Sequence, residues 1–137
     1  MKKPAPPQTD PVKSNQGFET PRAVVQIIDQ WSDELRNDDV NLLLLRGEHG
    51  WTLRQVARVL QASHTTIQRR WNDLTRRLSI LARAEYAFRV GRISQEQLEI
   101  ARSYWAGKQT TRQIARKRKC RTDKIADLLK DIRSAIG

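Results

Sequence analysis

GWTLRQVARVLQASHTTIQRRWNDLTRRL, residues 50–78, has the pattern of two helices joined by a tight turn. Thr52 and Gln55 are spaced as a capping box, in which each side chain binds a backbone amide at the start of a helix. Ala57 provides the small side chain that two closely crossing helices require. The turn occupies residues 61–63, and its last residue, Ser63, can cap the helix that follows. This arrangement predicts a helix-turn-helix, a motif that places its second helix in the major groove of DNA.

The second of these helices is expected to be long, running from His64 to about Val90 before Gly91 ends it. Its apolar residues recur at alternating spacings of four and three, which is the pattern of a helix-pairing seam. These residues are Ile67, Trp71, Leu74, Leu78 and Leu81. The first half of the seam should pack as core against the preceding helix, where Leu60 is a core position. Beyond Leu78, burial within the chain and a dimer interface fit the pattern equally well.

Before the motif, the sequence predicts a disordered leader and two further helices. Residues 1–19 carry four of the five prolines among polar residues, which favours disorder. Thr20 and Pro21 are typical of a helix start, and an apolar face continues from there to about Arg36. Residues 37–39 would close that helix, and a short, strongly apolar helix would follow.

After the long helix, the motif returns near the C-terminus. Ser94 and Gln97 are spaced as another capping box, which would open a helix reaching Gly107. Residues 110–116 then match residues 52–58 at an offset of 58, with five of the seven positions identical. Such a match predicts an internal duplication of the helix-turn-helix.

The two copies differ in ways that predict different roles. Leu60, an apolar core position in the first copy, becomes Arg118 in the second. The last helix of the second copy carries Asp123, Asp127 and Asp131, which oppose entry into a groove lined by phosphates. We expect the first copy to be the better base reader, and the second to clamp phosphate or to contact a partner.

The charge of the chain favours a polyanionic partner. The net charge is +11, and residues 41–137 hold 21 basic and eight acidic residues, against five and seven in residues 1–40. With one cysteine and two histidines, neither a disulfide framework nor a structural zinc site is expected, and no cofactor is predicted. No segment has the pattern of a secretory signal or a membrane span, so we expect a cytoplasmic, nucleoid-associated protein.

In the first copy, the side chains at the start of the second helix are expected to reach base edges. They are His64, Thr65, Thr66, Gln68 and Arg69. Arginine can bond guanine through two hydrogen bonds, and glutamine can bond adenine in the same way. Thr122 and Lys124 occupy equivalent reading positions in the second copy.

Basic residues of both copies are expected to contact phosphates, which positions a protein on DNA without reading sequence. They are Arg54, Arg58, Arg70, Arg76, Arg77, Arg112, Arg116, Lys117, Arg118, Lys119 and Arg121. No catalytic constellation is predicted, because the sequence has no phosphate-binding glycine loop and no set of residues spaced as a nucleophile triad. Asp73 and Glu85 are explained more simply as salt-bridging residues of the long helix than as metal ligands of a nuclease.

A further group of residues in the motif follows a known pattern. These residues are Gly50, Val56, Ala57, Leu60, Ser63, Thr66, Ile67, Arg69, Trp71 and Leu78. With them, the segment from Leu42 to Leu78 resembles region 4 of sigma-70-type RNA polymerase sigma factors, especially the extracytoplasmic-function class. The resemblance covers about a quarter of the chain, and it implies major-groove binding near a promoter with contact to RNA polymerase. Residues 1–40 are too short for the region 2 of such factors, so the chain resembles a region-4-like module used twice.

We therefore predict an all-α fold in which two tandem helix-turn-helix units are linked by a long helix. Residues 1–19 form the leader, residues 20–90 hold the first unit with the long helix, and residues 91–137 hold the second. The predicted function is that of a sequence-specific, double-stranded DNA-binding transcriptional regulator, acting as a homodimer or beside RNA polymerase. Two other classes fit the pattern. One is a DNA-recognition adaptor for a separate enzyme, such as a terminase small subunit or a transposase part, and the other is an RNA polymerase-interacting module.

Overall fold

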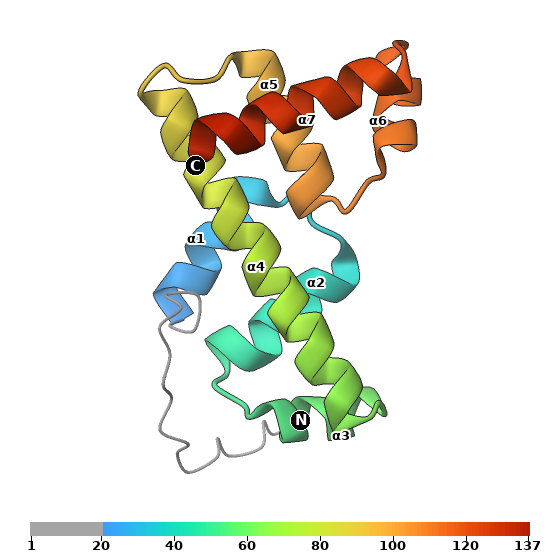
Figure 1. The fold of residues 1–137 in the computed structure, drawn as a ribbon. Coiled ribbons are helices and arrows are strands. Elements are labelled where there is room, and N and C mark those ends of the chain that lie inside the picture. Colours follow the sequence, from blue (N-terminus) through green and yellow to red (C-terminus); the bar gives the residue numbers. More distant parts are fainter. Residues whose placement is uncertain (1–20) are drawn as a thin grey trace. The chain divides into compact units, whose positions relative to one another are not determined.

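The computed structural model describes residues 21–137, with side chains from residue 26 onward, and none of these residues forms a strand. The predicted leader and the cap at Thr20 lie outside the described residues. The helices, shown in Figure 1, are α1 (Pro21–Trp31), α2 (Asn37–Leu42), the π-helix η2 (Leu43–Glu48), α3 (Leu53–Leu60), α4 (His64–Arg89), α5 (Gln95–Ala101), the π-helix η3 (Arg102–Ala106), α6 (Thr111–Arg118) and α7 (Thr122–Ile136). The predicted all-α fold with two helix-turn-helix units and a long helix is confirmed.

The described chain divides into two compact units, and the division falls inside α4, between Thr75 and Arg76. Unit 1 holds α1, α2, η2, α3 and the first half of α4. Unit 2 holds residues 33–36, the second half of α4 and all later helices. The sequence placed this boundary after residue 90, at the end of the long helix, whereas each half of α4 packs with a different core.

In unit 1, hydrogen bonds cap both helices of the motif. The Thr52 hydroxyl accepts a hydrogen bond from the Gln55 amide at 3.1 Å, and the Gln55 side chain accepts one from the Thr52 amide at 3.2 Å. Gln61 ends α3 in the left-handed conformation, with φ of 57°, and Ser63 accepts a hydrogen bond from the Thr66 amide at the start of α4. Both predicted caps are confirmed. Val56 and Ala57 of α3 are buried.

Unit 2 repeats this construction at an offset of 58 residues. Thr110 and Gln113 form the capping box of α6, with hydrogen bonds of 3.1 and 2.8 Å. Lys119 ends α6 with φ of 57°, the same left-handed conformation as its counterpart Gln61. Ser94 and Gln97 form the predicted box at the start of α5, the helix that packs against α7.

The repeat is longer than the sequence revealed. At the same offset, α2 and η2 of unit 1 correspond to α5 and η3 of unit 2, and each pair consists of an α-helix running into a π-helix. Leu42 and its counterpart Ile100 are both fully buried. No residue from 37 to 51 is identical to the one 58 positions later, so only the burial pattern and the backbone show that these helices are equivalent.

Three expectations about the elements were wrong in detail. α1 ends at Trp31, not near Arg36, and residues 37–39 open α2 instead of closing the first helix. Asp38 and Asp39 lie in the first turn of α2, where carboxylates interact favourably with the positive end of the helix dipole. Leu60 is only half-buried and is not a core residue, because it lies in the last turn of its short helix.

The apolar seam of α4 is buried within the chain along its whole length. Ile67, Trp71 and Leu74 belong to the core of unit 1, while Leu78 and Leu81 belong to the core of unit 2. The far half of the seam is therefore core, because unit 2 covers it. A homodimer remains a prediction that does not depend on this seam. None of the described helices has the length and apolar character to cross a membrane.

Candidate nucleic-acid interface

The first turns of α4 expose the residues that the sequence predicted as base readers. Thr65, Thr66 and Arg69 are exposed, while His64 and Gln68 are half-buried. The Gln68 amide nitrogen donates a hydrogen bond to the Asn72 side chain at 3.3 Å. These five residues share the end of one helix and do not belong to its buried stripe, so a groove-binding surface is geometrically available.

This exposure follows from how the helix is anchored. Ile67, between the reading positions, is fully buried, and Trp71 one turn later is 5% exposed. Because side chains three and four apart share a face of a helix, burying these two residues leaves Thr65, Thr66 and Arg69 off the buried face and exposed. The hydrogen bond from the Thr66 amide to Ser63 Oγ fixes where the helix begins.

The phosphate-contact residues predicted in the first copy of the motif fall into three groups. Arg54, Arg58 and Arg76 are exposed, as a phosphate contact requires. Arg70 is half-buried and its guanidinium lies 3.7 Å from the Asp38 carboxylate, so it is engaged within the unit. The fifth residue, Arg77, is buried in unit 2, the unit that also holds Arg76.

Arg77 is a correction to the predicted site. Its side chain is 5% exposed, and its guanidinium donates a hydrogen bond of 2.8 Å to the backbone carbonyl of Trp105. Arg77 is therefore a structural residue of unit 2 and cannot reach a phosphate. The sequence could not reveal this, because an arginine beside Arg76 on a basic helix has no local sign of burial.

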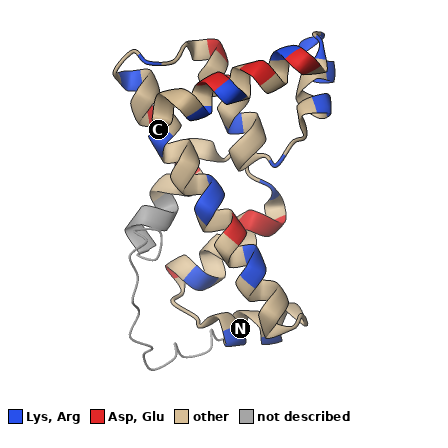
Figure 2. Cartoon of the chain, in the orientation of Figure 1, with Lys and Arg blue, Asp and Glu red and all other residues tan. Residues whose placement is uncertain are grey.

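In unit 2, Thr122 and Lys124 are exposed at the predicted reading positions. Their neighbours differ from those of unit 1, because Asp123 stands where unit 1 has Thr65 and Asp127 stands where it has Arg69. Both aspartates are exposed, and acidic residues form red bands along α7 in Figure 2. The exposed face of α7 therefore carries negative charge where the first copy carries a polar and a basic side chain.

The basic run of unit 2 is mostly available to solvent. The exposed members are Arg112, Arg116, Lys117, Lys119 and Arg121. Arg121 lies 3.3 Å from Asp123, but both side chains are more than three-quarters exposed, so this ion pair is screened and weak. These residues remain candidates for phosphate contact.

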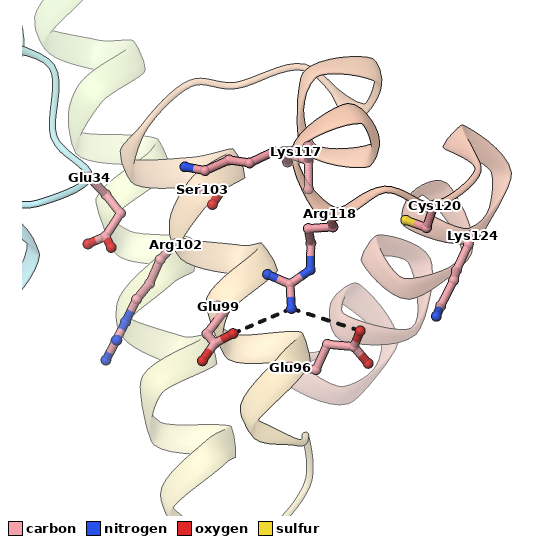
Figure 3. Close-up of a pocket in the computed structure, with 10 residues that line it drawn as sticks. Glu34, Glu96, Glu99, Arg102, Ser103, Lys117, Arg118, Cys120 and Lys124 are labelled. Atoms are coloured by element: carbon pink, nitrogen blue, oxygen red, sulfur yellow. Dashed lines mark hydrogen bonds and ion pairs between the residues drawn. The ribbon is translucent and has the colours of Figure 1, made fainter.

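Arg118 differs from the rest of this run. Its guanidinium lies 3.4 Å from the Glu99 carboxylate and 3.9 Å from that of Glu96, and Figure 3 shows it held between the two. The pKa of Glu99 is lowered, first by a hydrogen bond from Gln95 and then by Arg118. Replacing Leu60 by arginine in the second copy thus created an ion-pair cluster, and Arg118 is already engaged within it.

The Arg118 cluster lines a hollow of about 480 Å³ in unit 2, shown in Figure 3. On its wall, Arg102 binds the Glu85 carboxylate through two hydrogen bonds of 2.9 and 3.2 Å, which raise the pKa of Arg102. Burial raises the pKa of Glu34, on the same wall. Glu85 is thus a salt-bridging residue of α4, as predicted. The hollow combines acids and bases, so it does not favour a ligand of one charge.

A second hollow, of about 310 Å³, lies in unit 1 beside the reading positions. It is lined by Arg46, Thr52, Leu53, Arg54 and His64. The sequence predicted DNA contacts for Arg54 and His64, but not for Arg46, which lies in the apolar run of η2. In the sequence, Arg46 follows four leucines and precedes a glycine, which is the only local sign that this cation is unusual. The tertiary structure brings these three basic residues to one place.

No protein-family model, curated protein or solved structure matches this chain. Among the described side chains, no group of three His, Cys, Asp or Glu residues is arranged to hold a metal ion. The features of the described chain that bear on function are the exposed start of α4 and the basic residues around it.

Proposed function

We propose that this chain is a non-catalytic DNA-binding protein that recognises specific double-stranded sequences through the start of α4 and regulates transcription. The observation that carries the proposal is the exposure of Thr65, Thr66 and Arg69 at the N-terminal end of a helix held by a capped helix-turn-helix. A helix presented in this way fits the major groove, where its first turns can reach base edges.

The chemistry of these side chains supports base reading. The Arg69 guanidinium can donate two hydrogen bonds to guanine, and the Gln68 amide can bond adenine, each discriminating by about 1–3 kcal/mol. Arg54 and Arg58 are exposed on the neighbouring helix α3, from which phosphates on the groove wall can be contacted. The net charge of +11 adds long-range attraction to DNA.

The resemblance of residues 42–78 to sigma region 4 supports a site of action near promoters. RNA polymerase and a second copy of the chain are the protein partners that we propose on this basis, with the bacterial nucleoid as the place of action. The wholly buried seam of α4 means that a homodimer would use another surface.

The direct test is the double variant Gln68→Ala with Arg69→Ala. A binding site is first selected from random duplexes, and affinities for this site and for an unrelated duplex are then compared by fluorescence anisotropy. We expect the variant to lose most of the preference between the two duplexes while it keeps salt-sensitive binding, because its phosphate contacts remain. The double variant Arg116→Ala with Lys119→Ala serves as the control, since it removes two cations from unit 2 and should keep the preference.

Full sequence preference in the Gln68→Ala, Arg69→Ala variant would show that unit 1 is not the reader. Two other outcomes would favour the alternative classes. A ring-shaped oligomer in solution would favour a terminase-like adaptor, and co-purification with RNA polymerase without duplex binding would favour an interaction module.

A further inference from the structure

We infer that the hollow of about 310 Å³ in unit 1 binds one phosphate of the DNA backbone, held by Arg46, Arg54 and His64. This inference rests on the proposed function and names a contact that would position the reading helix. The hollow lies between the first turn of α3, the end of η2 and the first residue of α4.

Arg46 is held in place before any ligand arrives. Its side chain is half-buried, and one guanidinium nitrogen donates a hydrogen bond of 3.0 Å to the backbone carbonyl of Trp51. A cation fixed in this way loses little conformational entropy when it binds an anion. Arginine also matches the geometry of a phosphate, because its planar group presents several donors.

The backbone of the hollow also favours an anion. Thr52 is the N-cap of α3, and Leu53 and Arg54 form its first turn, which is the positive end of the helix dipole. The capping box uses the amides of Thr52 and Gln55. The amides of Leu53 and Arg54 have no partner within the helix by its geometry, and such groups bind phosphate oxygens well.

The charge around the hollow has one sign. Of the five residues that line it, two are arginines, one is a histidine and none is acidic. The equivalent positions of unit 2 are Tyr104, Thr110, Thr111, Arg112 and Thr122, with a single cation. The hollow is therefore a property of the first copy and does not come with the helix-turn-helix backbone.

Its position identifies a backbone phosphate as the occupant. His64 lines the hollow and is also the first residue of α4, directly before the exposed Thr65 and Thr66. An anion seated there would lie beside the start of the reading helix, where a groove-bound helix meets the phosphates of the groove wall. His64 would then position the helix instead of reading a base.

The main test uses Arg54→Gln, because Arg54 is exposed and its replacement should leave the fold intact. We expect the affinity to fall about eightfold at about 0.1 M salt, equally for selected and unrelated duplexes, and the salt slope to fall by about one. Arg83→Gln, which removes the same charge from an exposed position in the second half of α4, is the matched control and should have a much smaller effect. Equal effects of the two variants would overturn the inference.

A second measurement locates the phosphate. Each phosphate of the selected duplex is replaced in turn by an uncharged methylphosphonate. One position should weaken binding of the unaltered protein about eightfold, and should weaken binding of Arg54→Gln no further. If, at every position, the affinity loss caused by the methylphosphonate adds to the loss caused by Arg54→Gln, then Arg54 contacts no single phosphate and the inference fails. Arg46→Lys keeps the charge but loses the paired donors. For this variant, the methylphosphonate at the same position should weaken binding by less than it does for the unaltered protein.

Inorganic phosphate distinguishes the other source of the same chemistry. If millimolar phosphate shifts the His64 ring signals in NMR spectra while no methylphosphonate position is coupled to Arg54, the hollow binds free phosphate and the inference is overturned. Failure of the proposed function has a different signature, because Gln68→Ala with Arg69→Ala would then keep sequence preference whatever Arg54→Gln does.

Discussion

The two helix-turn-helix copies in this chain share a backbone and differ in surface. Both motifs start with a Thr and Gln capping box, both first helices end in a left-handed residue with φ of 57°, and both bury the same isoleucine position at 0% exposure, Ile67 and Ile125. Outside the core, Arg69 corresponds to Asp127 and Thr65 to Asp123. The comparison shows that the residues that build this motif and the residues that set its surface charge are separate sets.

The separation has a physical basis. Caps and core positions are constrained because a missing cap or a cavity costs the folded state directly. The exposed positions of α4 and α7 contribute little to stability, so they can exchange charge without loss of fold. Unit 1 has Arg46, Arg54 and His64 around a hollow at the start of α4, whereas unit 2 has exposed aspartates on α7 and pairs Arg118 with Glu96 and Glu99.

The largest effect is expected when the first copy is given the surface charge of the second. Thr65→Asp with Arg69→Asp introduces the aspartates of positions 123 and 127 into unit 1. We expect a loss of affinity for the selected duplex of about 100-fold or more, because a base-contacting cation is lost and carboxylates face phosphates. Fluorescence anisotropy measures the loss, and circular dichroism should be unchanged because both positions are exposed.

The reciprocal variant, Asp123→Thr with Asp127→Arg, serves as the control. It should leave binding intact or strengthen it, since it removes negative charge from α7. If the unit 1 variant binds as well as the unaltered protein, the start of α4 does not meet DNA and the difference between the copies has no role in binding.

An effect of intermediate size should be the same in both copies. Thr52→Ala and Thr110→Ala each remove the hydroxyl that accepts the N3 amide at 3.1 Å. Each substitution should lower the free energy of unfolding by about 1 kcal/mol, measured by urea denaturation. Thr111→Ala, one residue beyond the second box, is the control and should cost less. If only one of the two capping variants is destabilised, the copies are not energetically equivalent.

The smallest effect concerns a cluster that only unit 2 has. Because the pKa of Glu99 is lowered below its ordinary value of 4.5, its charged form stabilises the folded state above that pH, and this stabilisation is lost as the pH falls through the lowered value. Glu99→Gln should therefore lower the melting temperature slightly at neutral pH, and the difference from the unaltered protein should shrink below pH 4.5. A difference that persists unchanged in acid would show that the ionised carboxylate is not the cause.

Much of the fold could be predicted because its signals are local. Each of these signals spans only a few residues. They are the capping boxes at Thr52 and Ser94, the turn at residues 61–63 and the glycine after α4. The duplication was visible only where identity was high, in residues 52–58 and 110–116. The equivalence of α2 with α5 was missed because those helices share burial and not residue identity.

The candidate site was predicted in part for the same reason. The exposure of Thr65 and Arg69, two of the predicted base readers, follows from helical periodicity around the buried Ile67. Arg77 and Arg46 could not be placed, because their environments come from segments distant in the chain or on other helices. Arg77 donates a hydrogen bond to the backbone carbonyl of Trp105, 28 positions later. Arg46 lines a hollow together with Arg54 and His64.

Local signals in the sequence are enough to predict most of the helices, their caps, the turn of the motif and the repetition of residues 52–58, since each depends on contacts within about one or two helical turns. Packing between helices, in contrast, establishes which cations are exposed and which are buried or paired, and where the two units divide along α4. These properties depend on residues that are distant in the sequence. Arg77, for example, is buried where it contacts the carbonyl of Trp105. The net charge can be counted from the sequence, but the exposure of each charged side chain depends on how all the helices pack.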